Sequence, residues 1–181
     1  MGCKRFVGAG SQAEYGPQNG ILGPDSPTRP TMAYGIAKLA AGALCALECQ
    51  RLNLRFNWAR IFSVYGPYDN DQTLISLLID CLERRETMPL TACEQQWDYL
   101  YASDCGRALR LIAERGADQA VYCVGGGDAR PLREYVAEIG RCYRTDLTPW
   151  MGKVPYAPGQ VMYLCADIRS LTNDTGFVPE V

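Results

Sequence analysis

The most informative stretch of this sequence is Tyr-Gly-Ile-Ala-Lys at residues 34–38, preceded by Ser11 in the stretch Gly-Ser-Gln-Ala-Glu-Tyr-Gly at residues 10–16. Residues four apart on a helix share a face, so Tyr34 and Lys38 are expected to point into one site. A neighbouring cation favours a phenolate and lowers the pKa of a tyrosine from its ordinary value of about 10. A serine hydroxyl within reach can hold a substrate oxygen while the tyrosine moves its proton. The pattern predicts an acid/base site made of Ser11, Tyr34 and Lys38.

Strands and helices are expected to alternate along the rest of the chain. The predicted strands cover residues 5–9, 55–64, 99–101 and 120–124, and the predicted helices cover residues 33–52, 74–85, 104–114 and 131–143. Residues 16–30 and 145–165 are rich in turn formers and are expected to be irregular. Thr31 and Asp104 are candidate N-caps, and Pro131 suits a first helical turn. This alternation indicates an α/β fold with parallel strands.

The composition is typical of a globular protein. The chain has 181 residues, of which 48% are apolar and 21% are charged, enough for one ordinary domain with a core. A net charge of -2 and the lack of a Lys/Arg run argue against nucleic acid and membrane surfaces as partners. No apolar run reaches the length of a membrane span, and the first residues do not resemble a signal peptide.

Cysteine and histidine usage narrows the chemistry. The nine cysteines are spread along the chain without a Cys-x-x-Cys pair, and there is no histidine. This pattern favours reduced cysteines in a cytoplasmic protein over disulfides or a metal site. Without histidine, Ser-His-Asp and Cys-His catalysis are excluded within this chain, which leaves Tyr, Lys, Asp and Glu as acid/base candidates.

The order of strand, Ser11, loop, Tyr-x-x-x-Lys helix and further strand resembles the extended short-chain dehydrogenase/reductases, the NAD-dependent epimerase/dehydratase family acting on nucleotide sugars. Four further stretches resemble the family in the same order: Arg-Ile-Phe-Ser-Val-Tyr-Gly-Pro at residues 60–67, Gln-Trp-Asp-Tyr-Leu-Tyr-Ala-Ser-Asp at residues 96–104, Val-Tyr-Cys-Val-Gly at residues 121–125, and the tail at residues 166–179. The resemblance covers nearly the whole chain.

The resemblance implies a partial Rossmann-like parallel sheet with helices plus a small substrate-binding lobe. Residues 1–66 would form the C-terminal half of the Rossmann domain, and residues 99–130 would return to it. Residues 67–98 and 131–181 would build the lobe, with the second part truncated at its C-terminus.

The glycine-rich NAD-binding loop of the family is not found in this sequence. Such a loop follows a strand, opens a helix and holds the pyrophosphate with backbone N–H groups. Gly8 and Gly10 are followed by Ser11 and a loop, and the glycines at residues 125–127 come late and are followed by Pro131, so ordinary turn roles are favoured for both. The resemblance therefore implies a C-terminal fragment that lacks the NAD-binding half of the family. That half would be supplied by an upstream segment or by a complementing chain. The exposed sheet edge of such a fragment favours self-association.

By resemblance, Tyr34 as phenolate removes a proton from a sugar hydroxyl while hydride passes to NAD or NADP. Lys38 would hold the nicotinamide ribose and lower the pKa of Tyr34, and Ser11 would bond the reacting oxygen. Phe62 falls where the family places a residue against the nicotinamide, although an apolar residue ending a strand is as easily part of a core.

Departures from the family pattern bear on the reaction. Where 4,6-dehydratases of the family carry an acidic group after the Ser/Thr position, this chain has Gln12 and Ala13. Glu14 comes one place later and, if the strand continued, would face away from Ala13. Dehydration is therefore disfavoured, which leaves epimerase or keto-sugar reductase chemistry.

Two further departures bear on the substrate. Ser63 stands where many members carry an Asn that contacts the diphosphate, and Trp97 stands where many carry a phosphate-binding Arg. Trp97 can stack on a base or sugar, or simply pack, but it cannot form a charge-assisted bond. Other cations that can supply a phosphate contact are Arg130, Arg133 and Arg141.

Two alternatives to an enzyme remain open. One is a non-catalytic remnant or interaction module with a vestigial site, and the other is a nucleotide-sugar-binding domain without redox chemistry. The sequence leaves the sugar, the nucleotide and the choice of NAD or NADP undecided.

Overall fold

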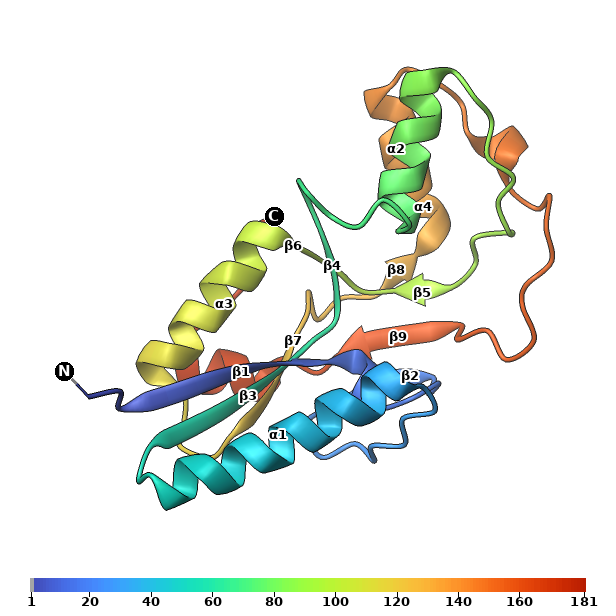
Figure 1. Ribbon diagram of the computed structural model, residues 1–181. Coiled ribbons are helices and arrows are strands. Elements are labelled where there is room, and N and C mark those ends of the chain that lie inside the picture. The colour runs from blue at the N-terminus through green and yellow to red at the C-terminus, as the bar shows by residue number, and fades with distance from the viewer. Residues whose placement is uncertain (1) are drawn as a thin grey trace.

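The computed structural model describes residues 2–181 and is built around a three-stranded parallel sheet (Figure 1). The strand order is β1-β3-β7, so β1 and β7 form the two edges. The strands are β1 (Arg5–Ser11), β3 (Arg55–Ile61) and β7 (Val121–Val124). In the parallel pairing of β1 with β3, Ser11 lies opposite Ile61. The predicted α/β class with parallel strands is confirmed.

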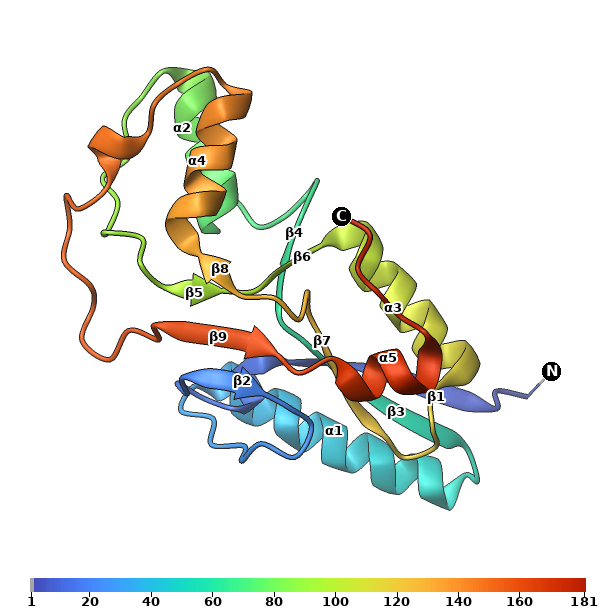
Figure 2. The same ribbon diagram turned by 180° about the vertical axis from the view of Figure 1, so that it is seen from behind.

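Helices cover both faces of this sheet, as Figures 1 and 2 show. Helix α1 (Ala33–Arg51) packs against β1 and β3 on one face. Helices α3 (Ala102–Arg115) and α5 (Arg169–Thr175) pack together on the other face.

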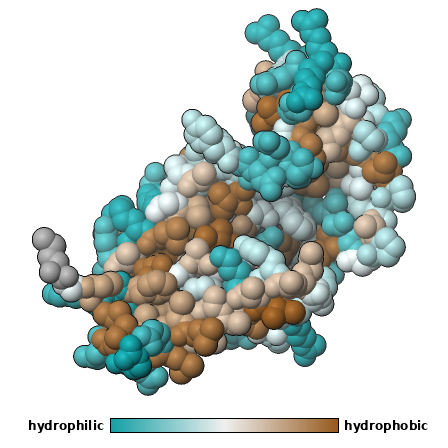
Figure 3. All heavy atoms as spheres, viewed as in Figure 1, coloured by the Kyte–Doolittle hydropathy of each residue, from teal (hydrophilic) through white to brown (hydrophobic). Residues whose placement is uncertain are grey.

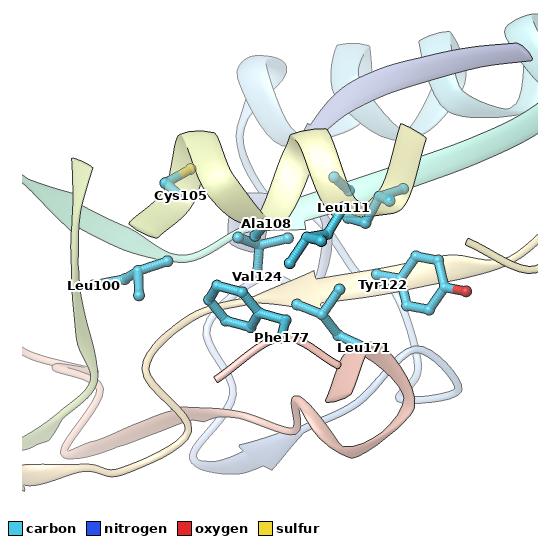
Figure 4. Packing of buried hydrophobic residues seen from close by; sticks show 10 residues of the cluster. Leu100, Cys105, Ala108, Leu111, Tyr122, Val124, Leu171 and Phe177 are labelled. Carbon is cyan, nitrogen blue, oxygen red and sulfur yellow. The ribbon is translucent and has the colours of Figure 1, made fainter. Parts of the chain in front are cut away.

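The main hydrophobic core lies between α3, α5 and the sheet (Figure 4). Tyr122 of β7, Leu171 of α5 and Phe177 are all fully buried there. Because apolar side chains of the tail fill this core, the tail belongs with the Rossmann-like sheet. The expectation that all of residues 131–181 join the substrate lobe is therefore wrong for α5 and the residues that follow it.

Glycine allows α1 to approach the sheet closely. The indole of Trp58 lies between β1 and α1, and a Cβ atom would stand 2.3 Å from this ring at Gly10 and 2.9 Å from it at Gly42. A larger residue at either place would collide with Trp58. This close approach keeps α1 packed on β1, the strand that ends at Ser11.

Two segments far apart in the sequence build a separate lobe. Helices α2 (Leu74–Arg84) and α4 (Leu132–Cys142) lie side by side away from the main sheet in both views of the ribbon. Their apolar faces enclose a second core with Leu90 and Leu147 among its buried members. The lobe is therefore held by its own hydrophobic contacts.

Short strands connect the lobe to the main sheet. Four form a second sheet in the order β2-β9-β5-β8, and two form a parallel pair, β4 with β6. Their bounds are β2 (Gly20–Leu22), β4 (Ser63–Tyr65), β5 (Gln96–Trp97), β6 (Tyr99–Tyr101), β8 (Arg130–Pro131) and β9 (Tyr163–Ala166). The short 3-10 helices are η1 (Gln12–Glu14) and η2 (Thr148–Trp150). Within residues 2–181, no helix has the length and apolar character needed to cross a membrane.

Three predicted segments differ from the structure. The predicted strand at residues 55–64 is interrupted at Phe62, which separates β3 from β4 in the chain and packs in a core with Tyr15 and Leu164. The strands β2 and β9 lie in segments expected to be irregular, because neither has the length or alternation that a sequence pattern needs.

Two predicted helix caps are also wrong. The N-cap of α1 is Met32 rather than Thr31, and no side chain caps that end. Helix α3 begins at Ala102, so Asp104 lies inside its first turn. The Asp104 carboxylate accepts hydrogen bonds from the backbone N–H groups of Glu180 and Val181 instead, so it anchors the C-terminal tail.

Candidate active site

Ser11 ends strand β1 and begins the 3-10 helix η1. Its Oγ accepts a hydrogen bond from the backbone N–H of Ala13 at 3.2 Å, and its own N–H donates to Oε1 of Glu14 at 2.9 Å. These two bonds form a capping box, which fixes the turn at the carboxyl end of the strand. Since Oγ acts as an acceptor in this box, the hydroxyl proton of Ser11 remains available to a substrate oxygen.

Tyr34 and Lys38 come from the first two turns of α1 and share one face of it. The Nζ atom of Lys38 lies 5.8 Å from the centre of the Tyr34 ring and donates a hydrogen bond to the carbonyl of Ala9 at 2.9 Å. That bond ties the ammonium group to β1, two residues before Ser11. The Tyr34 side chain is 58% exposed, so its hydroxyl is accessible to a ligand.

A pocket of about 400 Å³ opens at this end of β1 and brings Ser11, Tyr34 and Trp97 together. Trp97 comes from β5 of the second sheet, whereas Ser11 ends β1 of the main sheet, so both sheets contribute to the pocket wall. The other lining residues are Gln12, Ala13, Gly16, Pro17, Gln18, Thr31, Met32, Val161 and Leu164. Of the three predicted catalytic residues, Ser11 and Tyr34 line this cavity and Lys38 does not.

The sequence did not reveal a buried ion pair between Glu14 and Arg60, which is joined to the backbone of Ser11. Glu14 is fully buried, and its carboxylate accepts hydrogen bonds from Nε of Arg60 at 2.9 Å and from Nε1 of Trp58 at 2.9 Å. Arg60 also donates to the hydroxyl of Tyr15 at 3.1 Å. The strand-like facing considered for Glu14 does not apply, because the chain turns into η1 directly after Ser11. The spacing Ser-x-x-Glu, which is that of a capping box, was the signal available.

Ser63 and Trp97 contact each other directly. The indole Nε1 of Trp97 donates to Oγ of Ser63 at 2.8 Å, and the hydroxyl of Tyr135 donates to the Trp97 carbonyl at 3.1 Å. Trp97 also lines a second pocket of about 340 Å³, so it contributes to the walls of both cavities. The alternative cations lie outside both cavities: Arg130 pairs with Asp128, Arg141 pairs with Glu138, and Arg133 is exposed.

Phe62 is placed apart from the first pocket. Its side chain is 5% exposed and packs in a core with Tyr15, with 6.1 Å between the two ring centres. The structure does not bring it together with Tyr34, so its contact with a nicotinamide stays a prediction.

Neither glycine cluster is free to hold a pyrophosphate. The N–H groups of Gly126 and Gly127 donate to the carboxylate of Asp98 at 2.7 and 3.0 Å. The space beside Gly8 and Gly10 is filled by the Trp58 ring. For an NAD-type cofactor, neither glycine cluster offers a phosphate cradle, and binding of the nicotinamide end at Tyr34 and Lys38 stays a prediction.

The buried cysteines do not form a nucleophilic or metal-binding centre. Burial raises the pKa of Cys123 to about 11, and its Sγ lies 3.1 Å from the hydroxyl of Tyr15. The thiol is therefore protonated at neutral pH. Across the described part of the chain, no three His, Cys, Asp or Glu side chains are placed to hold a metal ion.

The parallel sheet with helices on both faces defines a Rossmann-type α/β protein. Comparison with known proteins identifies the family within this class. Residues 1–125 match the model of the NAD dependent epimerase/dehydratase family. The chain belongs to this family.

Curated relatives include nucleotide-sugar enzymes. The dTDP-glucose 4,6-dehydratase of Streptomyces niveus is 30% identical over 184 residues, which cover 98% of this chain and 53% of that protein. The UDP-glucose 4-epimerase of Streptomyces lividans is 27% identical over 77% of this chain and 48% of its own length. The chain thus spans about half the length of the curated relatives it matches.

Solved structures of other proteins share this fold. MoeE5 in complex with UDP-glucose and NAD has a TM-score of 0.85 and 31% identity, covering 98% of this chain and 60% of that one. RMD from Pseudomonas aeruginosa complexed with NADPH also has a TM-score of 0.85, at 22% identity, covering 99% of this chain and 62% of that one. The second likeness concerns the fold alone.

Proposed function

We propose that this chain supplies the substrate and acid/base side of an NAD(P)-dependent nucleotide-sugar epimerase or keto-sugar reductase. The observation that carries the proposal is the meeting of Ser11 and Tyr34 in one pocket, with the Lys38 ammonium bonded to Ala9 beside them. Family membership and relatives that act on nucleotide sugars support it.

In the proposed mechanism, a sugar hydroxyl enters the pocket and donates its proton to the Tyr34 phenolate. The positive charge of Lys38 stabilises that phenolate, and the Ser11 hydroxyl donates to the reacting oxygen. A nicotinamide cofactor, when bound, supplies or accepts the hydride. In the reverse direction, Tyr34 gives its proton to the carbonyl oxygen of the keto sugar, which becomes a hydroxyl.

Epimerase or reductase chemistry is proposed over dehydration. Gln12 and Ala13 line the pocket where water elimination needs an acidic group. Glu14, the next carboxylate, is bound by Arg60, Trp58 and the Ser11 N–H. It is therefore unavailable to a substrate.

We further propose that a complementing segment with a glycine-rich loop adds to the free edge of β1 and holds the pyrophosphate. β1 is an edge strand of seven residues, and its carboxyl end carries the candidate site. In Rossmann-type proteins, dinucleotides bind at the carboxyl ends of the parallel strands, which is the end of β1 that carries the candidate site.

The test is a fusion protein. Residues 2–181 are joined behind the part of the Streptomyces niveus dehydratase that precedes its matching segment, and UDP-glucose and dTDP-glucose are incubated with NAD or NADP. The proposal predicts nicotinamide reduction or a new sugar epimer. A folded fusion that binds the cofactor yet alters neither sugar would contradict the proposal and favour a non-catalytic module.

A further inference from the structure

The ammonium group of Lys38 is bonded at the edge of the main sheet and not in the pocket that Ser11 and Tyr34 share. Helix α1 runs alongside β1 (Figure 1), and Nζ of Lys38 donates a hydrogen bond to the carbonyl of Ala9 at 2.9 Å. Ser11 and Tyr34 line the pocket, but Lys38 does not. Since Nζ is only 5.8 Å from the centre of the Tyr34 ring, the lysine stands near the candidate site while its donor is used elsewhere.

The Ala9 carbonyl faces the open edge of β1. The backbone N–H of Arg55 donates to the Lys4 carbonyl at 3.1 Å, so Lys4 presents its carbonyl to β3. Backbone groups alternate in direction along a strand, so Ala9, at an odd spacing from Lys4, presents its groups to the opposite side. Within residues 2–181, β1 pairs with β3 alone, so that opposite side is the open edge of the sheet.

Two charged side chains cap this edge at the carboxyl end of β1. Lys38 donates to the Ala9 carbonyl, and the Glu14 carboxylate accepts the N–H of Ser11 at 2.9 Å. Charged side chains, lysine especially, protect sheet edges against further strands. Glu14 is fully buried and bonded to Arg60, whereas Lys38 is partly exposed on a flexible four-carbon stem. Lys38 is therefore the cap that a further strand can displace.

A further strand at this edge needs the Ala9 carbonyl. Such a strand would lie about 4.8 Å from β1 and donate a backbone N–H to the same oxygen. Nζ of Lys38 occupies a donor position 2.9 Å from that oxygen. The incoming N–H and the ammonium therefore compete for one acceptor.

We infer that addition of a parallel strand to β1 displaces Lys38 from Ala9 and releases its ammonium into the pocket beside Tyr34. The segment that completes the sheet then also assembles the pair of Tyr34 and Lys38. Without that strand, Lys38 serves as an edge cap. The inference rests on the proposed function and specifies how its site is regulated.

The first experiment measures the reactivity of Lys38 in the 181-residue chain and in the fusion protein described above, both without cofactor. Each is treated briefly with an N-hydroxysuccinimide ester of acetic acid, and mass spectrometry gives the acetylation of Lys38 relative to Lys153, which is exposed. The ratio is expected to be about tenfold higher in the fusion, because the hydrogen bond that holds the ammonium has been lost. An unchanged or lower ratio would overturn the inference.

Hydrogen exchange tests the strand addition itself. The amides of Val7 and Ala9 face the open edge, so they should exchange at least about tenfold more slowly in the fusion than in the 181-residue chain. The Gly8 amide faces β3 and is the internal control, protected in both proteins. A folded fusion in which Val7 and Ala9 exchange as fast as before would contradict strand addition and the inference with it.

Substitution of Ala9 links the two measurements. Ala9→Pro removes the outward N–H and keeps the carbonyl, so it blocks pairing at this edge while Lys38 can still bond. In the fusion, this variant should return the reactivity of Lys38 to that of the 181-residue chain. Ala9→Ser keeps the N–H and is the matched control, expected to behave like the unsubstituted fusion. Equal Lys38 reactivity in the two variants would show that release does not depend on strand pairing and would contradict the inference.

The two proposals fail separately. A fusion in which strand addition releases Lys38, but which transfers no hydride, keeps the release and loses the enzymatic function. A fusion that transfers hydride while Lys38 stays as unreactive as in the 181-residue chain does the reverse.

Discussion

Glu14 shows how single residues support the candidate site. Its carboxylate joins the Ser11 backbone to Arg60 and Trp58 inside the protein. Removing one partner of a buried ion pair leaves the other charge uncompensated. The turn that carries Ser11 therefore depends on a charge that substrate never touches.

Replacing this charge is expected to destabilise the protein strongly. Glu14→Gln keeps the shape of the side chain but leaves Arg60 unpaired, so the free energy of unfolding should fall by about 3–5 kcal/mol in urea denaturation. Glu48→Gln is the matched control, because Glu48 pairs with Arg51 on the surface and its loss should leave stability unchanged. Equal midpoints for Glu14→Gln and wild type would contradict the role of the ion pair.

At this scale the sequence predicted part of the site. Helical spacing and motif order placed Ser11, Tyr34 and Lys38 in one candidate site. The structure brings Ser11 and Tyr34 to one pocket and bonds Lys38 to Ala9, and the catalytic roles of the three stay predictions. Glu14 was considered only as it would face on a strand, whereas it lies in the 3-10 helix that follows Ser11. The bond between Trp97 and Ser63 joins residues 34 positions apart, and no local pattern encodes such a contact.

Among the elements, α1 shows how packing decides the effect of a residue. Glycine inside a helix ordinarily costs stability relative to alanine. At Gly42 an added Cβ would meet the Trp58 ring at 2.9 Å, whereas at Gly106 of α3 nothing lies within 4 Å. The two helical glycines should therefore respond oppositely to the same substitution.

Gly106→Ala is expected to stabilise the protein by about 0.5–1 kcal/mol. Gly42→Ala is expected to destabilise it by about 1–3 kcal/mol, because the ring must move or the helix must shift. Thermal unfolding of the two variants measures whether each substitution raises or lowers the stability of the protein. Stabilisation by Gly42→Ala would show that α1 does not contact the sheet as described.

Helix α3 holds the C-terminal tail through Asp104. Burial alone raises the pKa of this carboxyl, but hydrogen bonds from Arg107 and from the Glu180 and Val181 N–H groups outweigh it and hold the pKa below its ordinary value. The stability that Asp104 contributes is therefore present above about pH 3.9, its pKa in the unfolded chain, and is lost as pH falls through the lower folded value.

Asp104→Asn tests this anchor. The variant is expected to lose about 1–3 kcal/mol at pH 7 and to show a shallower decline of stability in acid than wild type. Hydrogen exchange of the Glu180 and Val181 amides should accelerate. Identical acid unfolding curves for the two proteins would contradict the anchor.

The sequence predicted most elements of the fold because their apolar patterns are long. It missed β2 and β9, which have three and four residues and gain their order from pairing with each other. The tail was assigned to the lobe because no sequence pattern states which core Leu171 and Phe177 enter.

For the whole molecule, an open sheet edge and an apolar surface lie close together. Figure 3 shows hydrophobic residues gathered over β1 and α1. Exposed members include Met32, Ile36, Leu44 and Leu47. Contiguous apolar surface beside an unpaired strand favours association.

The 181-residue chain alone is expected to self-associate. Sedimentation should give an average mass that rises with concentration, and Leu44→Lys should lower it because the charge interrupts the apolar surface. Gln72→Lys, in an exposed loop, is the control and should change nothing. A single monomeric species at every concentration would contradict this expectation.

The most direct test of the account concerns Tyr34 in the fusion protein described above. Nicotinamide turnover with UDP-glucose or dTDP-glucose is compared for wild type, Tyr34→Phe and Tyr68→Phe, the last being a fully exposed tyrosine outside the pocket. Tyr34→Phe is expected to lower the rate about 10²–10⁴-fold while Tyr68→Phe leaves it unchanged. Equal rates for wild type and Tyr34→Phe would contradict the assignment of Tyr34 as the acid/base.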